Sequence, residues 1–296
     1  MSDQDENQIF IEKLARAEEE VAEARSKNSP DLLQKLNYLA TFYHIGTNPD
    51  RLTEITDEIQ ALRISQGLLP GPNLVFLALD WCRIGNDKKA LEILDRAEKQ
   101  FIDAKVPRDA VEWEIFLGSK CHLLVGLDRF DEAVVLQRRK VEIIQRTKPE
   151  HTDLFESRGY LADILQFKTG DINAAIRERE VLLESFRKLI ATGPLSFRAM
   201  AVYIPNGILL ALYYSDSKKG DEAIALLQEI SNEVENSPVF GARAIEAPTL
   251  LILIAETHHK GGKASIAKKF AARALTSLKQ FNHDDPALIA RAEALL

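Results

Sequence analysis

Apolar residues recur along most of the chain at spacings of three and four, which is the pattern of amphipathic helices. In one clear stretch the run Leu77–Trp81 is followed by the polar turn Gly85–Asp87, and a second apolar-periodic segment then opens at Ala90. The same arrangement returns several times, up to a last copy that runs from Ile254 to Ala274. A helix, a short turn and a second helix are therefore expected as the repeating unit of the fold.

In five of the six expected units the second helix opens on a small residue. The six anchor positions are Leu52, Ala90, Ala133, Ala175, Ala223 and Ala267. Successive anchors are separated by 38, 43, 42, 48 and 44 residues. A small side chain lets two helix axes approach to the usual distance of about 8–10 Å. Each hairpin has an apolar face that it cannot bury alone, so neighbouring hairpins are expected to stack.

Pro-containing breaks precede the first helix in five of the six units and support these boundaries. They include Ser29-Pro30, Leu69–Asn73, Lys148–Thr152, Thr192–Pro194 and Asn236–Pro238. The pattern predicts three segments: residues 1–29 as an N-terminal tail and capping helix, 30–280 as a helical solenoid, and 281–296 as a C-terminal capping helix. Pro205, inside an expected first helix, should kink that helix.

This pattern resembles the tetratricopeptide repeat (TPR) family, over roughly residues 30 to 280. The period exceeds the common 34 residues of that family and is similar to the variant in kinesin light chain and some bacterial regulators. The phrases Asn37–Tyr43 and Pro149–Asp153 add to the similarity. The resemblance implies an all-α, right-handed α-solenoid of about six TPR-like helix-turn-helix pairs with terminal capping helices. The shared residues are packing residues, so they predict how helices stack and not what is bound.

Composition adds few constraints on function. The chain has 296 residues, 28% of them charged, with a net charge of −7 and no basic stripe, so nucleic acid is not an expected partner. The N-terminus is acidic and lacks the pattern of a signal peptide. The longest apolar run, Ile204–Tyr214, is interrupted by Pro205, so no membrane span is expected. A cytoplasmic, soluble protein is the resulting expectation.

Motifs of catalysis are not found in the sequence. It contains no P-loop, dinucleotide fingerprint, HExxH or GxSxG, and Gly261-Gly262-Lys263 is expected to be a helix-connecting turn. Cys82 and Cys121 are expected to be reduced core thiols, without the spacing of a metal site. His258 and His259 are adjacent on a helix, point to different faces and do not suit one ion. We therefore expect a non-enzyme without cofactor or metal, which binds a protein or peptide.

In the resembled family the first helices line the concave face of the solenoid. The outward polar residues of those helices are the candidate partner-binding residues: Gln34, Asn37, Thr41, His44, Arg83, His122, Asp163, Gln166, Asp216, Glu256 and His259. Family members that grip a C-terminal carboxylate use Lys, Arg and Asn at matching positions. Here those positions carry Thr41, Leu79, His122, Asp163, Leu212 and Glu256. An extended peptide or a helix is therefore a better candidate partner than a carboxylate tail.

Two alternatives remain open at this point. The chain could be a peptide-sensing regulatory module, although the roughly 28 residues before the first unit are too few for a helix-turn-helix domain, so an output domain would lie on another chain. The other alternative is a structural homo-oligomer, such as a homodimer through the terminal helices, that buries Leu288, Ile289, Leu295 and Leu296 of the C-terminal helix against a second copy. Solenoid ends often present apolar surface, which motivates this second alternative.

Overall fold

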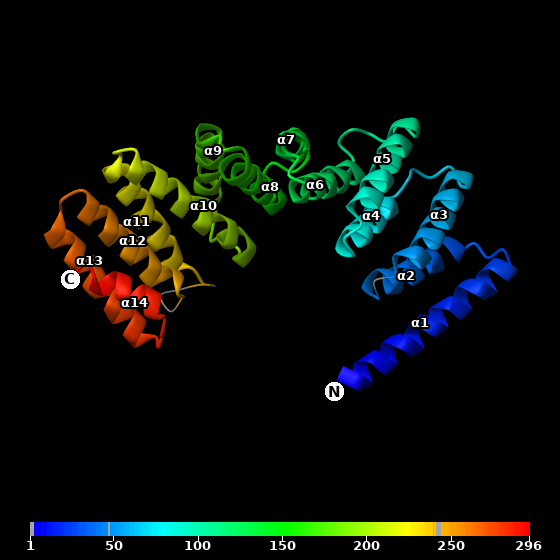
Figure 1. Ribbon diagram of the computed structural model, residues 1–296, viewed down its shortest axis with the longest axis horizontal. Helices are drawn as coiled ribbons and strands as arrows, with labels where there is room; N and C mark the ends of the chain where they lie inside the picture. Colours follow the sequence, from blue (N-terminus) through cyan, green and yellow to red (C-terminus); the bar gives the residue numbers. More distant parts are fainter. Residues whose placement is uncertain (1–2, 47, 239, 241–243) are drawn as a thin grey trace. The chain divides into compact units, whose positions relative to one another are not determined.

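The fold consists of helices throughout the part of the chain that the computed structural model describes, which is residues 3–46, 48–238, 240 and 244–296. No strand occurs in those ranges, which confirms the predicted all-α class. The chain divides into two compact units, one ending at Thr147 and the other running from Lys148 to Leu296. In each unit the helices follow one another in chain order as antiparallel pairs (Figure 1).

The first unit contains seven helices among its described residues. They are α1 (Asp3–Ser26), α2 (Leu32–Ile45), α3 (Pro49–Ser65), α4 (Asn73–Arg83), α5 (Asp87–Asp103), α6 (Val111–Gly126) and α7 (Phe130–Thr147). Helices α2 and α3, α4 and α5, and α6 and α7 form hairpins. The first helices of these hairpins also contact one another, α2 with α4 and α4 with α6, so they form one continuous face of the unit.

The second unit repeats this arrangement. Its helices are α8 (Thr152–Ile164), α9 (Ile172–Ile190), α10 (Phe197–Asp216), α11 (Gly220–Asn236), α12 (Glu246–Lys260), α13 (Ala264–Gln280) and α14 (Pro286–Glu293), with a short π-helical turn η1 (Leu165–Thr169) after α8. The hairpins are α8 with α9, α10 with α11, and α12 with α13. Together the two units hold the six helix pairs that the sequence predicted.

The small anchor residues are buried, as expected of residues at helix crossings. Ala90, Ala133, Ala175, Ala223 and Ala267 are all fully buried. Leu52, the one anchor that is not an alanine, is also buried. At Gly207 on α10 an added Cβ would lie 2.4 Å from Cδ1 of Ile230 on α11, so the two helices approach too closely for a larger residue without a shift. The repeated small residues thus set the spacing between paired helices.

Short polar turns join the two helices of each hairpin. The side chain of Asn86 accepts a hydrogen bond from the backbone of Lys89 and caps α5. The side chain of Asp171 caps α9 in the same way, through the backbone of Ala174. Gly85 precedes the α5 cap with φ of +80°, a conformation that glycine adopts without steric cost. Local sequence therefore fixes where each second helix begins.

Helices also form at both ends of the array. The helix expected within residues 1–29 is α1, and its buried side includes Ala17, Val21 and Ala24. The C-terminal helix is α14, which packs on α12 and α13. Their role as caps stays a prediction. Leu288, one of four residues assigned to a possible dimer face, is instead buried beside Leu251 and Leu278 of its own unit.

Candidate functional site

Helices α2, α3 and α4 enclose a cavity of about 360 Å³ in the first unit. We refer to it as the α2–α4 pocket. It is lined by Asn37, Ala40, Thr41, His44, Leu52, Thr56, Asn73 and Phe76. Three of these, Asn37, Thr41 and His44, belong to the predicted partner-binding residues. The pocket is thus the place in the described structure where predicted residues converge on an open space.

Helical spacing explains why the α2 residues share the pocket. Asn37, Thr41 and His44 are four and three positions apart, so their side chains lie on one stripe of the helix. On α4, Asn73 and Phe76 are likewise three positions apart. Phe76 is 41% exposed, which is high for an aromatic side chain on a helix that packs on both sides. The pocket therefore combines amide, hydroxyl and imidazole groups with an accessible aromatic wall.

The two asparagines are linked across the pocket. Asn73 Nδ2 donates to Asn37 Oδ1 at 3.1 Å, and Asn37 Nδ2 donates to the carbonyl of Leu33 at 2.7 Å. These bonds fix the orientation of the Asn37 amide. Each primary amide has two donor hydrogens and an acceptor oxygen with two lone pairs, so both side chains keep hydrogen-bonding capacity beyond the bonds described. A peptide backbone offers the matching donor and acceptor groups.

A buried aspartate anchors the polar end of the pocket. Asp80 on α4 is 0% exposed, and its Oδ2 lies 2.7 Å from Nδ1 of His44. Its other oxygen lies 3.0 Å from Nη1 of Arg83. Asp80 and His44 share a hydrogen bond through Nδ1, and Nε2 is the second polar atom of the His44 ring. Arg83 also donates to the carbonyl of His44 at 3.3 Å, so it acts within the chain by bracing His44.

The floor of the pocket carries an unpaired hydroxyl. Thr56 on α3 is 1% exposed, and its Oγ1 has no hydrogen-bond partner among the described residues. One turn further along α3, Gln60 is also buried with both amide atoms without a described partner. A buried polar atom without a partner has a free-energy cost.

The remaining predicted residues of the first unit lie outside the pocket. Gln34 is exposed on α2, one turn before Asn37. His122 lies on α6, where burial of its ring and the nearby charge of Lys140 lower the pKa of the imidazole. Neither side chain lines the α2–α4 pocket. Their role in binding stays a prediction.

In the second unit, several predicted residues already have partners inside the chain. Asp163 lies 2.6 Å from Nη2 of the fully buried Arg179, and Glu256 forms two hydrogen bonds of 2.9 Å with Arg291. Asp216 is exposed and lies 3.2 Å from Lys260. The structure thus gives the two carboxylates of Asp163 and Glu256 a role in packing helices together.

Two further predicted partner-binding residues, Gln166 and His259, also lie in this unit. Gln166 is half-buried in the π-helical turn, and its Oε1 has no described partner. His259 is exposed at the end of α12, while its neighbour His258 is buried and stacked on Phe270 at 5.6 Å. The two imidazoles therefore face different environments, as the sequence predicted. No pocket that the structure defines brings these residues together.

Sequence reasoning missed six of the lining and anchoring residues. They are Ala40 and Leu52 as walls of the pocket, Thr56, Asn73, Phe76 and Asp80. One signal was present, because Asp80 interrupts the apolar run Leu77–Trp81 and a charge on an apolar helix face needs a partner. The other residues are recognisable only once α3 and α4 are packed against α2.

Within the described ranges, no group of three or more His, Cys, Asp or Glu residues is placed to hold a metal ion. The two cysteines are not bonded to each other, and burial raises the pKa of the Cys121 thiol to about 12. Among the described helices, none combines the length and the apolar character that crossing a bilayer requires.

Comparisons with known proteins define the fold class. No family model matches the sequence, and no curated protein matches it at a significant level. Solved structures do match. The nearly identical TPR-like repeats of a kinesin light chain from Podosopora anserina superpose with a TM-score of 0.52 at 17% identity, over 71% of this chain and 95% of that one. This chain has a TPR-like helical repeat fold.

Two further structures extend the likeness of this TPR-like protein along more of its length. BtubC (BKLC) from P. vanneervenii matches over 94% of both chains with a TM-score of 0.51 at 17% identity. A Signal Transduction ATPase with Numerous Domains from Pyrococcus horikoshii, which has a tetratricopeptide repeat sensor, matches 88% of this chain with a TM-score of 0.60 at 14% identity. This chain spans 37% of that ATPase. At these identities the likeness concerns the fold alone.

Proposed function

We propose that this TPR-like protein is a non-catalytic interaction module that binds an extended peptide or a helix on its first-helix face, with the α2–α4 pocket as the anchor. The observation that carries the proposal is the convergence of Asn37, Thr41 and His44 with Phe76 around one open cavity. Helical repeats position such faces rigidly, and their concave surfaces are a common binding surface for protein segments.

The chemistry of the pocket suits one anchoring side chain and the backbone beside it. Asn37 and Asn73 can pair with a peptide amide, since amide side chains offer both a donor and an acceptor. An apolar or aromatic side chain of the partner would contact Phe76 and Leu52. Burying an apolar side chain contributes about 1.5–3 kcal/mol, so the pocket alone supports moderate affinity.

A selection from a random peptide library, followed by fluorescence polarisation, tests the proposal. Peptides selected on the wild-type protein should lose at least about tenfold in affinity on Thr41→Arg, which fills the pocket from an exposed position and costs the contacts of one buried side chain. Thr276→Arg is the matched control, because Thr276 is also exposed and also bonds a carbonyl of its own helix. If Thr41→Arg and Thr276→Arg bind the selected peptides equally well, the pocket is not the binding site.

A further inference from the structure

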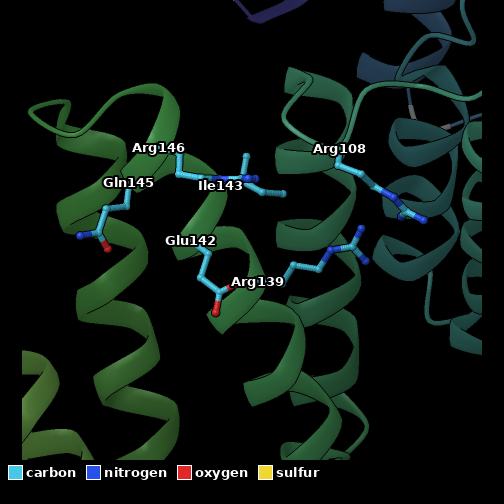
Figure 2. Close-up of a pocket in the computed structure, with 6 residues that line it drawn as sticks. All are labelled: Arg108, Arg139, Glu142, Ile143, Gln145 and Arg146. Atoms are coloured by element: carbon cyan, nitrogen blue, oxygen red, sulfur yellow. The ribbon is translucent and has the colours of Figure 1, made fainter.

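A second cavity lies away from the α2–α4 pocket, between α7 and the turn that leads into α6. Its volume is about 540 Å³. It is lined by Arg108, Arg139, Glu142, Ile143, Gln145 and Arg146 (Figure 2). Arg108 comes from the turn before α6 and the other five come from α7. We call it the arginine pocket.

A buried tryptophan holds two of the arginines in place. The ring of Trp113 is fully buried, and Cζ of Arg108 and Cζ of Arg139 lie 4.8 and 4.7 Å from its centroid. Figure 2 shows the guanidinium ends of these two side chains extending toward one another. An arginine over an aromatic face is attracted by the ring electrons and loses part of its freedom to reorient. Both guanidinium groups are therefore held at the same ring despite their equal charge.

The environment of Arg139 reflects this proximity. Its burial, and next the charge of Arg108, lower the pKa of the guanidinium, which remains protonated at neutral pH. Like charges that are held together raise the free energy of the site. An anion placed between them would lower that free energy.

Several arginines elsewhere in the chain have carboxylate partners. Arg129 pairs with Glu132 and Arg187 pairs with Glu229. By contrast, Arg108, Arg139 and Arg146 form no ion pair within the ranges that the structure describes. The pocket contains three arginines and one glutamate, which gives it a net charge of +2 in a chain whose total is −7.

We propose that the arginine pocket is a binding site for a phosphate monoester. A phosphate monoester carries about −1.5 to −2 charges at neutral pH and three strong acceptor oxygens, which matches a net charge of +2 and guanidinium forks. Arginine forks bind phosphate through paired, charge-assisted hydrogen bonds. The cavity is larger than a phosphate group alone, so the carrier of the phosphate, a phosphorylated side chain or a small metabolite, has room beside it. The arginine pocket is independent of the α2–α4 pocket, since it is built mainly on α7, the second helix of its hairpin.

Isothermal titration of the full chain at low ionic strength tests the site with two probes, glycerol phosphate and a short phosphoserine peptide, each beside its unphosphorylated counterpart. We expect saturable binding of at least one phosphorylated probe and none of its counterpart. Tighter binding of the peptide identifies a protein-borne ligand, and tighter binding of glycerol phosphate identifies a small metabolite. Either result supports the site, and the absence of saturable binding by both probes overturns it.

Variants then locate the binding. Arg139→Gln should weaken it roughly tenfold or more, which corresponds to the loss of charged hydrogen bonds. Arg146→Gln should weaken it less, and this exposed side chain has no packing role, so the variant keeps its fold. Arg273→Gln is the matched control, because Arg273 also lies over an aromatic ring, Phe270, at 5.4 Å but has no arginine neighbour in the described site. If Arg273→Gln weakens binding as much as Arg139→Gln, the proposal fails.

Discussion

The buried pair of Arg179 and Asp163 allows a quantitative test of how the second unit is held together. Arg179 is 0% exposed on α9, and Nη2 bonds Asp163 on α8 at 2.6 Å. Its Nε and Nη1 have no described partner. Removing the charge of Asp163 by Asp163→Asn would leave a buried, uncompensated guanidinium. Loss of one partner of a buried pair costs about 3–5 kcal/mol, and the half-exposed position of Asp163 places this variant near the lower end.

A loss of about 3 kcal/mol corresponds to a fall in melting temperature of roughly 6–12 °C for a unit of this size. Arg179→Met removes the buried charge and keeps most of the apolar stem, so its stability should stay within about 1 kcal/mol of the wild type. Asp163 then remains half-exposed and hydrated. The double variant should have the same melting temperature as Arg179→Met. Once Arg179 is replaced, the Asp163→Asn change no longer leaves a buried charge without a partner.

Differential scanning calorimetry of the four proteins measures these melting temperatures, and the double-mutant cycle isolates the pairwise free energy. The account is wrong if Asp163→Asn alone melts like the wild type, or if it lowers the melting temperature equally with and without Arg179. A confirmed cycle would also remove Asp163 from the partner-binding residues, since its carboxylate would be committed to Arg179.

Further outcomes follow from burial at two other positions. Ala223→Leu should destabilise the chain by about 1–3 kcal/mol through overpacking of the α10–α11 crossing, while Ala225→Leu, at an exposed position of the same helix, should stay within about 0.5 kcal/mol; equal urea midpoints for the two would contradict the crossing. Burial, and next Lys263, lower the pKa of His258, so the unfolded chain takes up that proton at higher pH than the folded one. The stability contributed by His258 is therefore present above about pH 6.5 and is lost as the pH falls below it. His258→Phe should reduce the change in melting temperature between about pH 7.5 and 5.5. The exposed control His259→Phe should retain the pH dependence of the wild type.

The fold could be predicted from sequence because its determinants are local and repeated. The spacing of Ala90, Ala133 and the other anchors, and caps such as Asn86, each act within one hairpin. The π-helical turn Leu165–Thr169 was not predicted, because one extra residue per turn leaves no mark in a pattern of period 3.6. Pro205 was expected to kink its helix, and it lies at an exposed position within the continuous helix α10; a bend there stays a prediction.

The candidate site was predicted only in part. Asn37, Thr41 and His44 share a helix face by their spacing alone, and that part of the inference needs no tertiary structure. The partners of Asp163 and Glu256 lie 16 and 35 residues away, so a single helix could not reveal that these carboxylates are engaged. Thr56 and Phe76 required knowledge of which helices pack around the cavity.

Photo-crosslinking in the protein's own cells tests the central claim most directly. A benzophenone amino acid replaces Phe76, which is 41% exposed and lines the α2–α4 pocket, or in a parallel sample Phe167, which is 60% exposed in the second unit. The account predicts a discrete crosslinked partner protein from position 76 that disappears when Thr41→Arg is added, with no such product from position 167. A partner that crosslinks from position 167 alone, or from position 76 regardless of Thr41→Arg, would contradict binding at the α2–α4 pocket.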